Sequence, residues 1–308
     1  MAGVKTFRRA VVLILIVATV AAILPGAIRS HEPSYQGRPL SAWLMDLEEG
    51  TDEKAQFAKE AVRHMGTNAI PPLLRMMQRQ DSKLQQNLIW LIQRQRIIKF
   101  RVTDATEQHL RASLGFVALG PIGQPSLFEL ARLISNPNTT RFTATALAAI
   151  GNDGVRAVTG ALLSTNVLVR REAAGVLGGL GIVRFATNST PKQLEVLESQ
   201  AQLAVPSLVA ACDDPDELVR ARAATALGLL GAKSELAVPA LIKALADGNS
   251  PWRVPSASAR ALGRFGSNAI PAIPALRQVQ KSQDLRVSQA AAIALEAIEE
   301  SEGRNSKK

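Results

Sequence analysis

Two segments of the chain share one pattern of apolar and small residues at helical spacing. Residues 219–231 read VRARAATALGLLG, and residues 169–181 read VRREAAGVLGGLG. In both, the apolar positions line one stripe of an α-helix, and the small residues beside that stripe let a neighbouring helix approach closely. One such helix cannot bury its own stripe. The two copies therefore predict an array in which each repeat covers the next one.

The same order of signals returns along residues 51–300. A first helix ends at a glycine, a few polar residues follow, and a second helix begins with an early proline, where a missing N–H costs little. The first pair is predicted over residues 54–65 and 69–80, and a last half-repeat over residues 285–300. The predicted ends of the first helices are Gly66, Gly120, Gly151, Gly181, Gly231 and Gly266. The pattern as a whole predicts about seven helix pairs.

Two spacings between these glycines are too long for one repeat, and each predicts an insertion. In the first, residues 83–94 predict an additional helix, and the alternating residues 96–103 (RIIKFRVT) predict an extended connector. In the second, over residues 182–200, Thr190 is expected to cap a helix over residues 192–202 that lengthens the next second helix. Ahead of the array, Ser41 is expected to cap a short helix over residues 42–48, whose Trp43 packs on the first repeat.

The composition supports an all-α fold. Hydrophobic residues make up 47% of the 308 residues but aromatic residues only 4%, which suits thin layers of helices better than sheets. A single cysteine, Cys212, excludes an intrachain disulfide framework and any cysteine-rich metal site. Cys212 is expected to be a small core residue at the end of a second helix.

The repeats resemble the HEAT-like repeat family, in particular its phycocyanobilin-lyase type. The matching residues are Val169-Arg170, Ala173-Ala174, Leu177-Gly178 and Leu180-Gly181, their counterparts from Val219-Arg220 onward, and a third copy from Val254-Pro255. The resemblance implies a right-handed α-solenoid whose second helices line a concave, protein-binding face. It also implies that an Asp–Arg pair six residues apart joins successive repeats, a spacing that Asp214 with Arg220 and Asp247 with Arg253 fit. The lead-in YQGRPLSAWL over residues 35–44 is similar to that of exported bacterial HEAT-repeat proteins.

The N-terminus has the features of a membrane-targeting segment. Lys5, Arg8 and Arg9 precede residues 10–28, which carry no charge. A spanning helix needs about 20 apolar residues, so we expect a transmembrane signal anchor, with a cleaved signal peptide as the alternative. Basic residues ahead of the apolar run keep residues 1–9 in the cytoplasm and place the repeats on the extracytoplasmic side. The expected location is thus the cell membrane, single-pass and facing the periplasm, or, after cleavage, the periplasm or the exterior.

The expected organisation follows from these signals. Residues 1–9 form a short cytoplasmic N-terminus, residues 10–28 the anchor or signal peptide, residues 29–50 a linker and capping segment, residues 51–300 the HEAT-like solenoid, and residues 301–308 a disordered tail.

One segment is unusually basic. Residues 59–111 contain ten lysines and arginines against four acidic residues. The candidate binding patch within it consists of Arg94, Arg96, Lys99 and Arg101 with the aromatic residues Trp90 and Phe100. Such a patch is either a solvated helix face or a contact for an acidic protein, an anionic membrane surface or a phosphate backbone. The exported topology disfavours nucleic acid.

Catalytic, metal-binding and cofactor-binding motifs were not found in the sequence. The three histidines (His31, His64 and His109) lie far apart, and neither an HExxH motif nor a nucleophile elbow is present. We therefore expect a non-enzymatic, membrane-tethered scaffold for protein–protein interaction that uses no cofactor. The alternatives are a lyase-like or enzyme-accessory HEAT protein and a nucleic-acid-binding HEAT protein.

Overall fold

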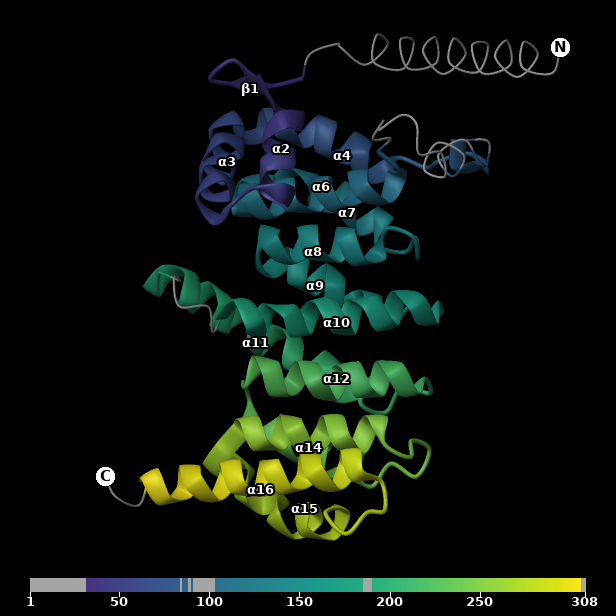
Figure 1. The fold of residues 1–308 in the computed structure, drawn as a ribbon, viewed down its shortest axis with the longest axis vertical. Coiled ribbons are helices and arrows are strands. Elements are labelled where there is room, and N and C mark those ends of the chain that lie inside the picture. The colour runs from purple at the N-terminus through teal and green to yellow at the C-terminus, as the bar shows by residue number, and fades with distance from the viewer. Residues whose placement is uncertain (1–31, 84, 88–89, 91–102, 185–189, 306–308) are drawn as a thin grey trace, which may run out of the picture.

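A computed structural model describes residues 32–83, 85–87, 90, 103–184 and 190–305. Within them the chain forms a stack of antiparallel helix pairs that runs from α2 at one end to α16 at the other (Figure 1). The first helices of the pairs are α3 (Asp52–Met65), α6 (Ala105–Leu119), α8 (Thr140–Ile150), α10 (Val167–Arg184), α12 (Glu217–Leu230) and α14 (Arg253–Phe265). The second helices are α4 (Ile70–Gln78), α7 (Leu127–Leu133), α9 (Asn152–Ala161), α11 (Pro191–Ala211), α13 (Ser234–Leu245) and α15 (Ile273–Val279).

Short 3-10 turns join three of the pairs, and a single long helix ends the array. The turns are η1 (Gly66–Ala69), η2 (Gly120–Ser126) and η3 (Gly266–Ala272), and the last helix is α16 (Leu285–Asn305). The predicted all-α repeat solenoid is confirmed, with six pairs and a final half-repeat in the described residues. α16 continues past the end predicted at residue 300 and takes in residues that were expected to begin a disordered tail.

The predicted glycine stops are confirmed at five of six positions. Gly66, Gly120, Gly231 and Gly266 have φ between 54° and 60°, and Gly151 has φ of 132°, all conformations that favour glycine at a helix end. Gly181 is different, because α10 continues through it to Arg184. A Cβ at Gly181 would lie 2.2 Å from the carbonyl oxygen of Leu229 in α12. Gly181 therefore permits close helix packing, and its prediction as a helix stop was wrong.

The N-terminal end of the stack is covered by the lead-in. The strands β1 (Ser34–Tyr35) and β2 (Arg38–Pro39) form a small antiparallel hairpin, and α2 (Leu40–Glu49) follows directly. Since α2 begins at Leu40, Ser41 is not its cap. The carboxylate of Glu32 instead accepts hydrogen bonds from the backbone N–H and, at 3.1 Å, the hydroxyl of Ser41. Trp43 is 2% exposed and packs edge-on against Phe57 of α3, as predicted.

The second insertion has the predicted effect, and the first lies largely outside the described residues. α11 is one helix of 21 residues that continues through Pro206, and Thr190 precedes its first residue. Of the additional helix predicted over residues 83–94, the described residues 83, 85–87 and 90 are helical, whereas most of the connector lies outside the description. The signal anchor predicted over residues 10–28 also lies outside it. No helix in the described part of the chain is long and apolar enough to span a membrane.

The first helices approach one another very closely. A Cβ at Gly178 of α10 would lie 3.2 Å from the Cα of Ala226 in α12, and one at Gly228 of α12 would lie 2.5 Å from the Cα of Ala261 in α14. Gly263 of α14 meets Ala294 of α16 in the same way, at 3.0 Å. Each of these contacts lets two helix backbones pack without intervening side chains.

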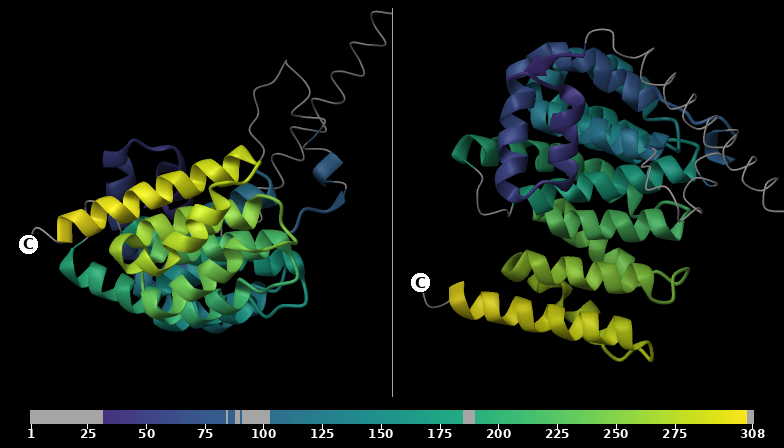
Figure 2. Two further views of the ribbon diagram at one scale, coloured as in Figure 1. Left: turned by 90° about the horizontal axis from the view of Figure 1, so that it is seen from below. Right: turned by 45° about the horizontal axis from the view of Figure 1, so that its top comes forward.

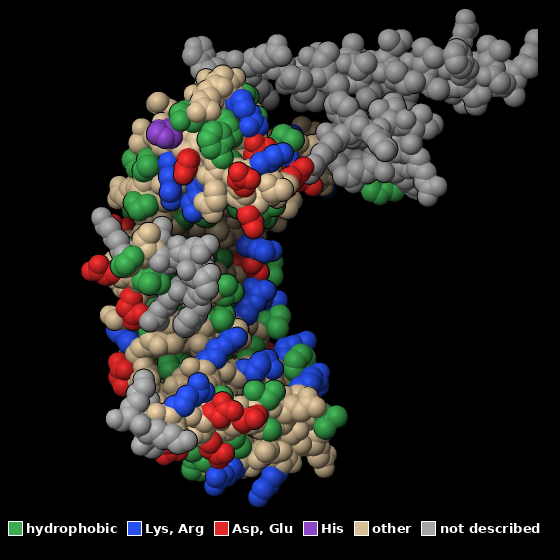
Figure 3. Space-filling view, turned by 60° about the vertical axis from the view of Figure 1, so that its left-hand side comes forward, with side chains coloured by type: hydrophobic (Ala, Val, Ile, Leu, Met, Phe, Trp, Pro, Cys, Tyr) green, Lys and Arg blue, Asp and Glu red, His purple; other side chains and the backbone are tan. Residues whose placement is uncertain are grey.

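The stack is curved, and the first helices lie on its inner side. In Figure 1 the helices α10, α12 and α14 face the viewer, and Figure 2 shows them lying side by side. Figure 3 shows that the stack is hollowed along this same side. The close glycine–alanine contacts draw this row of helices together, so the stack bends toward it. The resemblance implied that second helices would line the concave face, and in this chain that implication was wrong. We call the exposed sides of α8, α10, α12 and α14 the hollow face.

Candidate interaction surface

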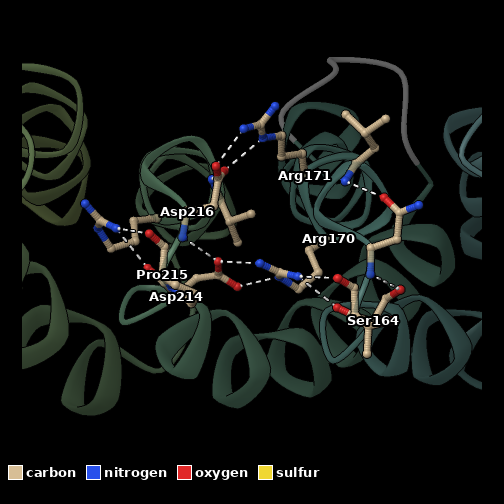
Figure 4. A network of polar contacts seen from close by, with 11 residues as sticks. Ser164, Arg170, Arg171, Asp214, Pro215 and Asp216 are labelled. Atoms are coloured by element: carbon tan, nitrogen blue, oxygen red, sulfur yellow. Dashed lines mark hydrogen bonds and ion pairs between the residues drawn. The ribbon is translucent and has the colours of Figure 1, made fainter.

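Arg170 and Arg220 join successive repeats at the turns that lead into the hollow face, and Figure 4 shows the contacts of Arg170. The guanidinium of Arg170 donates to both carboxylate oxygens of Asp214 in the next repeat, at 2.7 and 3.0 Å, and to the carbonyl of Ser164 in its own turn, at 2.9 Å. Arg220 repeats this arrangement with the carboxylate of Asp247, at 2.8 Å, and the carbonyl of Asp214, at 2.9 Å. Each arginine thereby fixes its own turn and the following one.

This arrangement corrects the predicted Asp–Arg pairing. Asp214 stands six residues before Arg220, and its backbone carbonyl accepts the hydrogen bond from Arg220. The carboxylate of Asp214 binds Arg170 instead. Arg253 does not pair with Asp247 either, because it binds Glu217 at 2.9 Å. The spacing of six therefore marks the contact within a turn, and the ion pairs run between repeats.

A second pair of charges lies beside the first. Arg171 binds both oxygens of Asp216, at 2.8 and 2.6 Å, and Asp216 caps α12 by accepting a hydrogen bond from the backbone N–H of Val219 at 3.0 Å. The hydrogen bond from Arg171 is the main reason why the pKa of Asp216 falls to about 2. Asp216 therefore stays ionised at neutral pH, and the contact between α10 and α12 stays intact.

The two rows of helices differ in charge. The first helices α8, α10, α12 and α14 contain nine arginines and two glutamates, and Asp214, Asp216 and Asp247 pair with three of these arginines, which leaves a net charge of +4. The second helices α9, α11 and α13 contain three basic and four acidic residues, a net charge of −1. Positive charge therefore gathers on the hollow side, where blue side chains line the edge of the hollow in Figure 3. An anionic partner would be attracted to this side.

Only part of the predicted basic patch can be placed. Trp90 is helical and 57% exposed, and it lines an open cleft of about 520 Å³ together with Arg79, Asp81 and His109. The imidazole Nε2 of His109 lies 2.8 Å from the carbonyl oxygen of Arg79, which makes this histidine a packed structural residue. The other members of the patch, Arg94, Arg96, Lys99, Phe100 and Arg101, lie outside the described residues.

One cluster of carboxylates was not predicted from the sequence. Glu48 and Glu49 of α2 and Glu107 of α6 converge, and the guanidinium of Arg111 binds Glu48 at 2.7 Å and also pairs with Glu107. Arg111 is largely buried, so these carboxylates compensate its charge. Counted from the glycine that ends each helix, Arg111 holds the same position in α6 as Arg222 holds in α12. The cluster thus joins the capping helix to the array.

Cys212 is buried at the end of α11, as predicted. Burial raises the pKa of its thiol to about 12, so the thiol stays protonated at neutral pH. A protonated, buried thiol is a poor nucleophile and a poor metal ligand.

In comparison with known proteins, one family model matches part of the repeat array. The family model for HEAT repeats matches residues 205–296. Among solved structures, an engineered protein from the Northeast Structural Genomics Consortium is 20% identical, covers 85% of this chain and 97% of its own length, and has a TM-score of 0.45. A designed armadillo repeat protein is 17% identical, covers 84% of this chain and 99% of its own, and has a TM-score of 0.42. No curated protein matches the sequence. Residues 205–296 are thus similar to HEAT repeats.

Proposed function

We propose that this protein is a non-enzymatic scaffold that binds another protein on its repeat surface. HEAT repeat proteins commonly act as scaffolds for protein interaction. The observation that carries the proposal is the hollow that runs along successive repeats, with an excess of arginine on the helices that line it. Such a surface contacts a partner over several repeats at once, and each repeat contributes its own side chains.

We propose further that residues 10–28 tether the scaffold to the cell membrane and that the repeats lie on the extracytoplasmic side. The basic residues before this apolar run support that orientation. A reporter that is active only outside the cytoplasm, fused after Lys308, tests it. An active fusion is expected, and an inactive one would place the repeats in the cytoplasm.

The basic patch of Arg94, Arg96, Lys99 and Arg101 is proposed as a second contact, for an acidic protein or an anionic membrane surface. Its closeness in sequence to the apolar N-terminal run supports this role. Reversal of all four charges to glutamate should abolish binding to vesicles that contain anionic lipid. If the folded variant binds the vesicles as well as the wild type does, the patch is a solvated surface without a binding role.

Affinity capture of the full chain from solubilised membranes, followed by mass spectrometry, tests the scaffold itself. A protein that is recovered reproducibly, and that survives a wash at physiological salt, is expected. A chain that recovers no protein above an untagged control would contradict the scaffold function.

A further inference from the structure

The hollow face offers three arginines that make no ion pair within the described part of the chain. They are Arg141 on α8 and Arg260 and Arg264 on α14, and all three are exposed. Among the arginines whose side chains the structure describes, Arg171, Arg222 and Arg253 on this face are engaged and bind Asp216, Glu172 and Glu217. Free positive charge is therefore concentrated at the two ends of the face.

Apart from Leu229 of α12, small residues occupy the outward positions of α10 and α12 that match those of Arg260 and Arg264. Gly175 and Gly179 of α10 and Thr225 of α12 occupy the outward line of their helices, at positions that Arg260 and Arg264 occupy in α14. A Cβ at Gly179 would meet no atom within 4 Å, so the packing of the solenoid does not require glycine there. Glycine inside a helix lowers stability relative to alanine, so its use on an open face suits the close approach of another chain.

We infer that the hollow face between α8 and α14 binds an acidic segment of a partner protein, held by Arg141 at one end and by Arg260 and Arg264 at the other. This inference rests on the proposed scaffold function and adds the face and the chemistry of the partner. Three steps between packed helices span about 27 Å, because neighbouring helix axes lie about 9 Å apart. An extended segment of about eight residues covers that distance at roughly 3.3 Å per residue.

The charges favour carboxylates at separate positions over a phosphate backbone. Carboxylates already lie beside Arg171, Arg222 and Arg253 on this face, where they would repel a continuous line of phosphates. A peptide can place its acidic residues at the ends and small or apolar residues in between. The ring of Trp252, which could otherwise stack on a base, is also engaged, since the guanidiniums of Arg286 and Arg253 lie 3.9 and 4.9 Å from it.

The test uses the full chain in detergent micelles and a fluorescein-labelled polyglutamate peptide of about twelve residues, with anisotropy as the readout. The variant Arg141→Glu/Arg260→Glu/Arg264→Glu should weaken binding by about tenfold or more. The matched control Arg75→Glu/Arg132→Glu/Arg156→Glu makes the same change of charge at exposed positions on second helices. It should stay within about twofold of the wild type. Circular dichroism checks that both variants fold.

A second pair of variants separates shape from charge. Gly179→Leu introduces the residue that α12 carries at the equivalent position, Leu229, and should weaken binding while the fold is kept. Its control, Gly160→Leu on α9, also places a side chain where no atom lies within 4 Å. Gly160→Leu should leave the affinity unchanged. Equal effects of the two leucines would show that close approach at Gly179 plays no part, and would overturn the inferred face.

Other outcomes overturn the inference or separate it from the scaffold function. If the wild-type protein does not bind polyglutamate, or binds a labelled oligothymidine more tightly, the partner is not an acidic protein segment. Equal losses in the two triple variants would show non-specific attraction. Partners that are still captured by the Arg141/Arg260/Arg264 variant would leave the scaffold function standing and reject this face, whereas a wild-type chain that captures no protein rejects the scaffold.

Discussion

Gly228 of α12 lies against Ala261 of α14 so closely that a Cβ on the glycine would be 2.5 Å from the alanine Cα. No side chain can move aside to make room, because the obstructing atom belongs to the backbone. Two further contacts, of Gly178 with Ala226 and of Gly263 with Ala294, repeat this relationship along the first helices. The curvature of the stack, and with it the hollow face, depends on these contacts.

Gly228→Ala should therefore destabilise the protein, although alanine is the better helix former. Overpacking of a tight contact costs about 1–3 kcal/mol, which outweighs the gain in helix propensity. Gly179→Ala is the control, because its new methyl group enters open space and should stabilise the helix by about 0.5–1 kcal/mol. Urea unfolding of both variants measures the difference. A stabilised Gly228→Ala variant would show that the two helices are not held at this distance.

Arg220→Ala should be strongly destabilising, because it leaves the largely buried carboxylate of Asp247 and the carbonyls of Asp214 and Pro215 without their donor. Removal of one partner from a buried ion pair costs about 3–5 kcal/mol. Arg222→Ala removes a more exposed pair with Glu172 and should cost about 1 kcal/mol or less. The free energies of unfolding of the two variants, compared under one set of conditions, decide this. Equal losses would contradict the structural role assigned to Arg220.

Leu227 is completely buried in α12, and Leu227→Ala should cost about 2–5 kcal/mol as a large-to-small change in a core. Leu163, which follows α9 closely and is 85% exposed, provides the control. Leu163→Ala should change the stability by less than about 0.5 kcal/mol. Thermal unfolding of the two variants tests the repeat register. A loss of stability of less than about 0.5 kcal/mol in Leu227→Ala would contradict that register.

The ion pair between Asp216 and Arg171 should make stability depend on pH in the acid range. The pKa of Asp216 is lowered from 3.8 to about 2 in the folded protein, chiefly by the hydrogen bond from Arg171. The contribution of the ion pair to the free energy of unfolding is therefore fully present above about pH 4 and is lost as the pH falls toward 2. Asp216→Asn keeps a side-chain acceptor for the helix cap but removes the charge. The difference in unfolding free energy between wild type and Asp216→Asn should shrink over this range, and a constant difference would exclude the ion pair as its source.

The last helix ends the array with a charge. In α12 and α14 a glycine, Gly228 or Gly263, stands two residues after the alanine that contacts the preceding helix. In α16 the residue two positions after the matching alanine, Ala294, is Glu296. A glutamate there prevents another first helix from packing closely on α16. Glu296→Gly should therefore permit end-to-end association of two copies, which light scattering would detect as a rise in mass with concentration. Glu302 is also exposed on α16, so Glu302→Gly is the control, and its mass in light scattering should match that of the wild type.

The sequence by itself determined the repeat architecture. Apolar stripes at helical spacing, glycine stops and early prolines are local signals, because helix propensity and capping act over a few residues. They located most of the helices, the terminal cap around Trp43 and the buried positions of Leu227 and Cys212. The same local rules failed at Gly181, because nothing near it in sequence reveals that Leu229 of the next repeat lies against it.

Only the tertiary structure decided which face of the solenoid is hollow and which charges remain free. Arg220 is six residues from Asp214, yet its carboxylate partner is Asp247, 27 residues later in the chain. Arg141, Arg260 and Arg264 look no different in sequence from Arg171 or Arg222. What distinguishes them is whether stacking brings a carboxylate from a neighbouring repeat within a few ångströms. That depends on the distance and rotation between packed helices, which the close contacts of Gly178, Gly228 and Gly263 set.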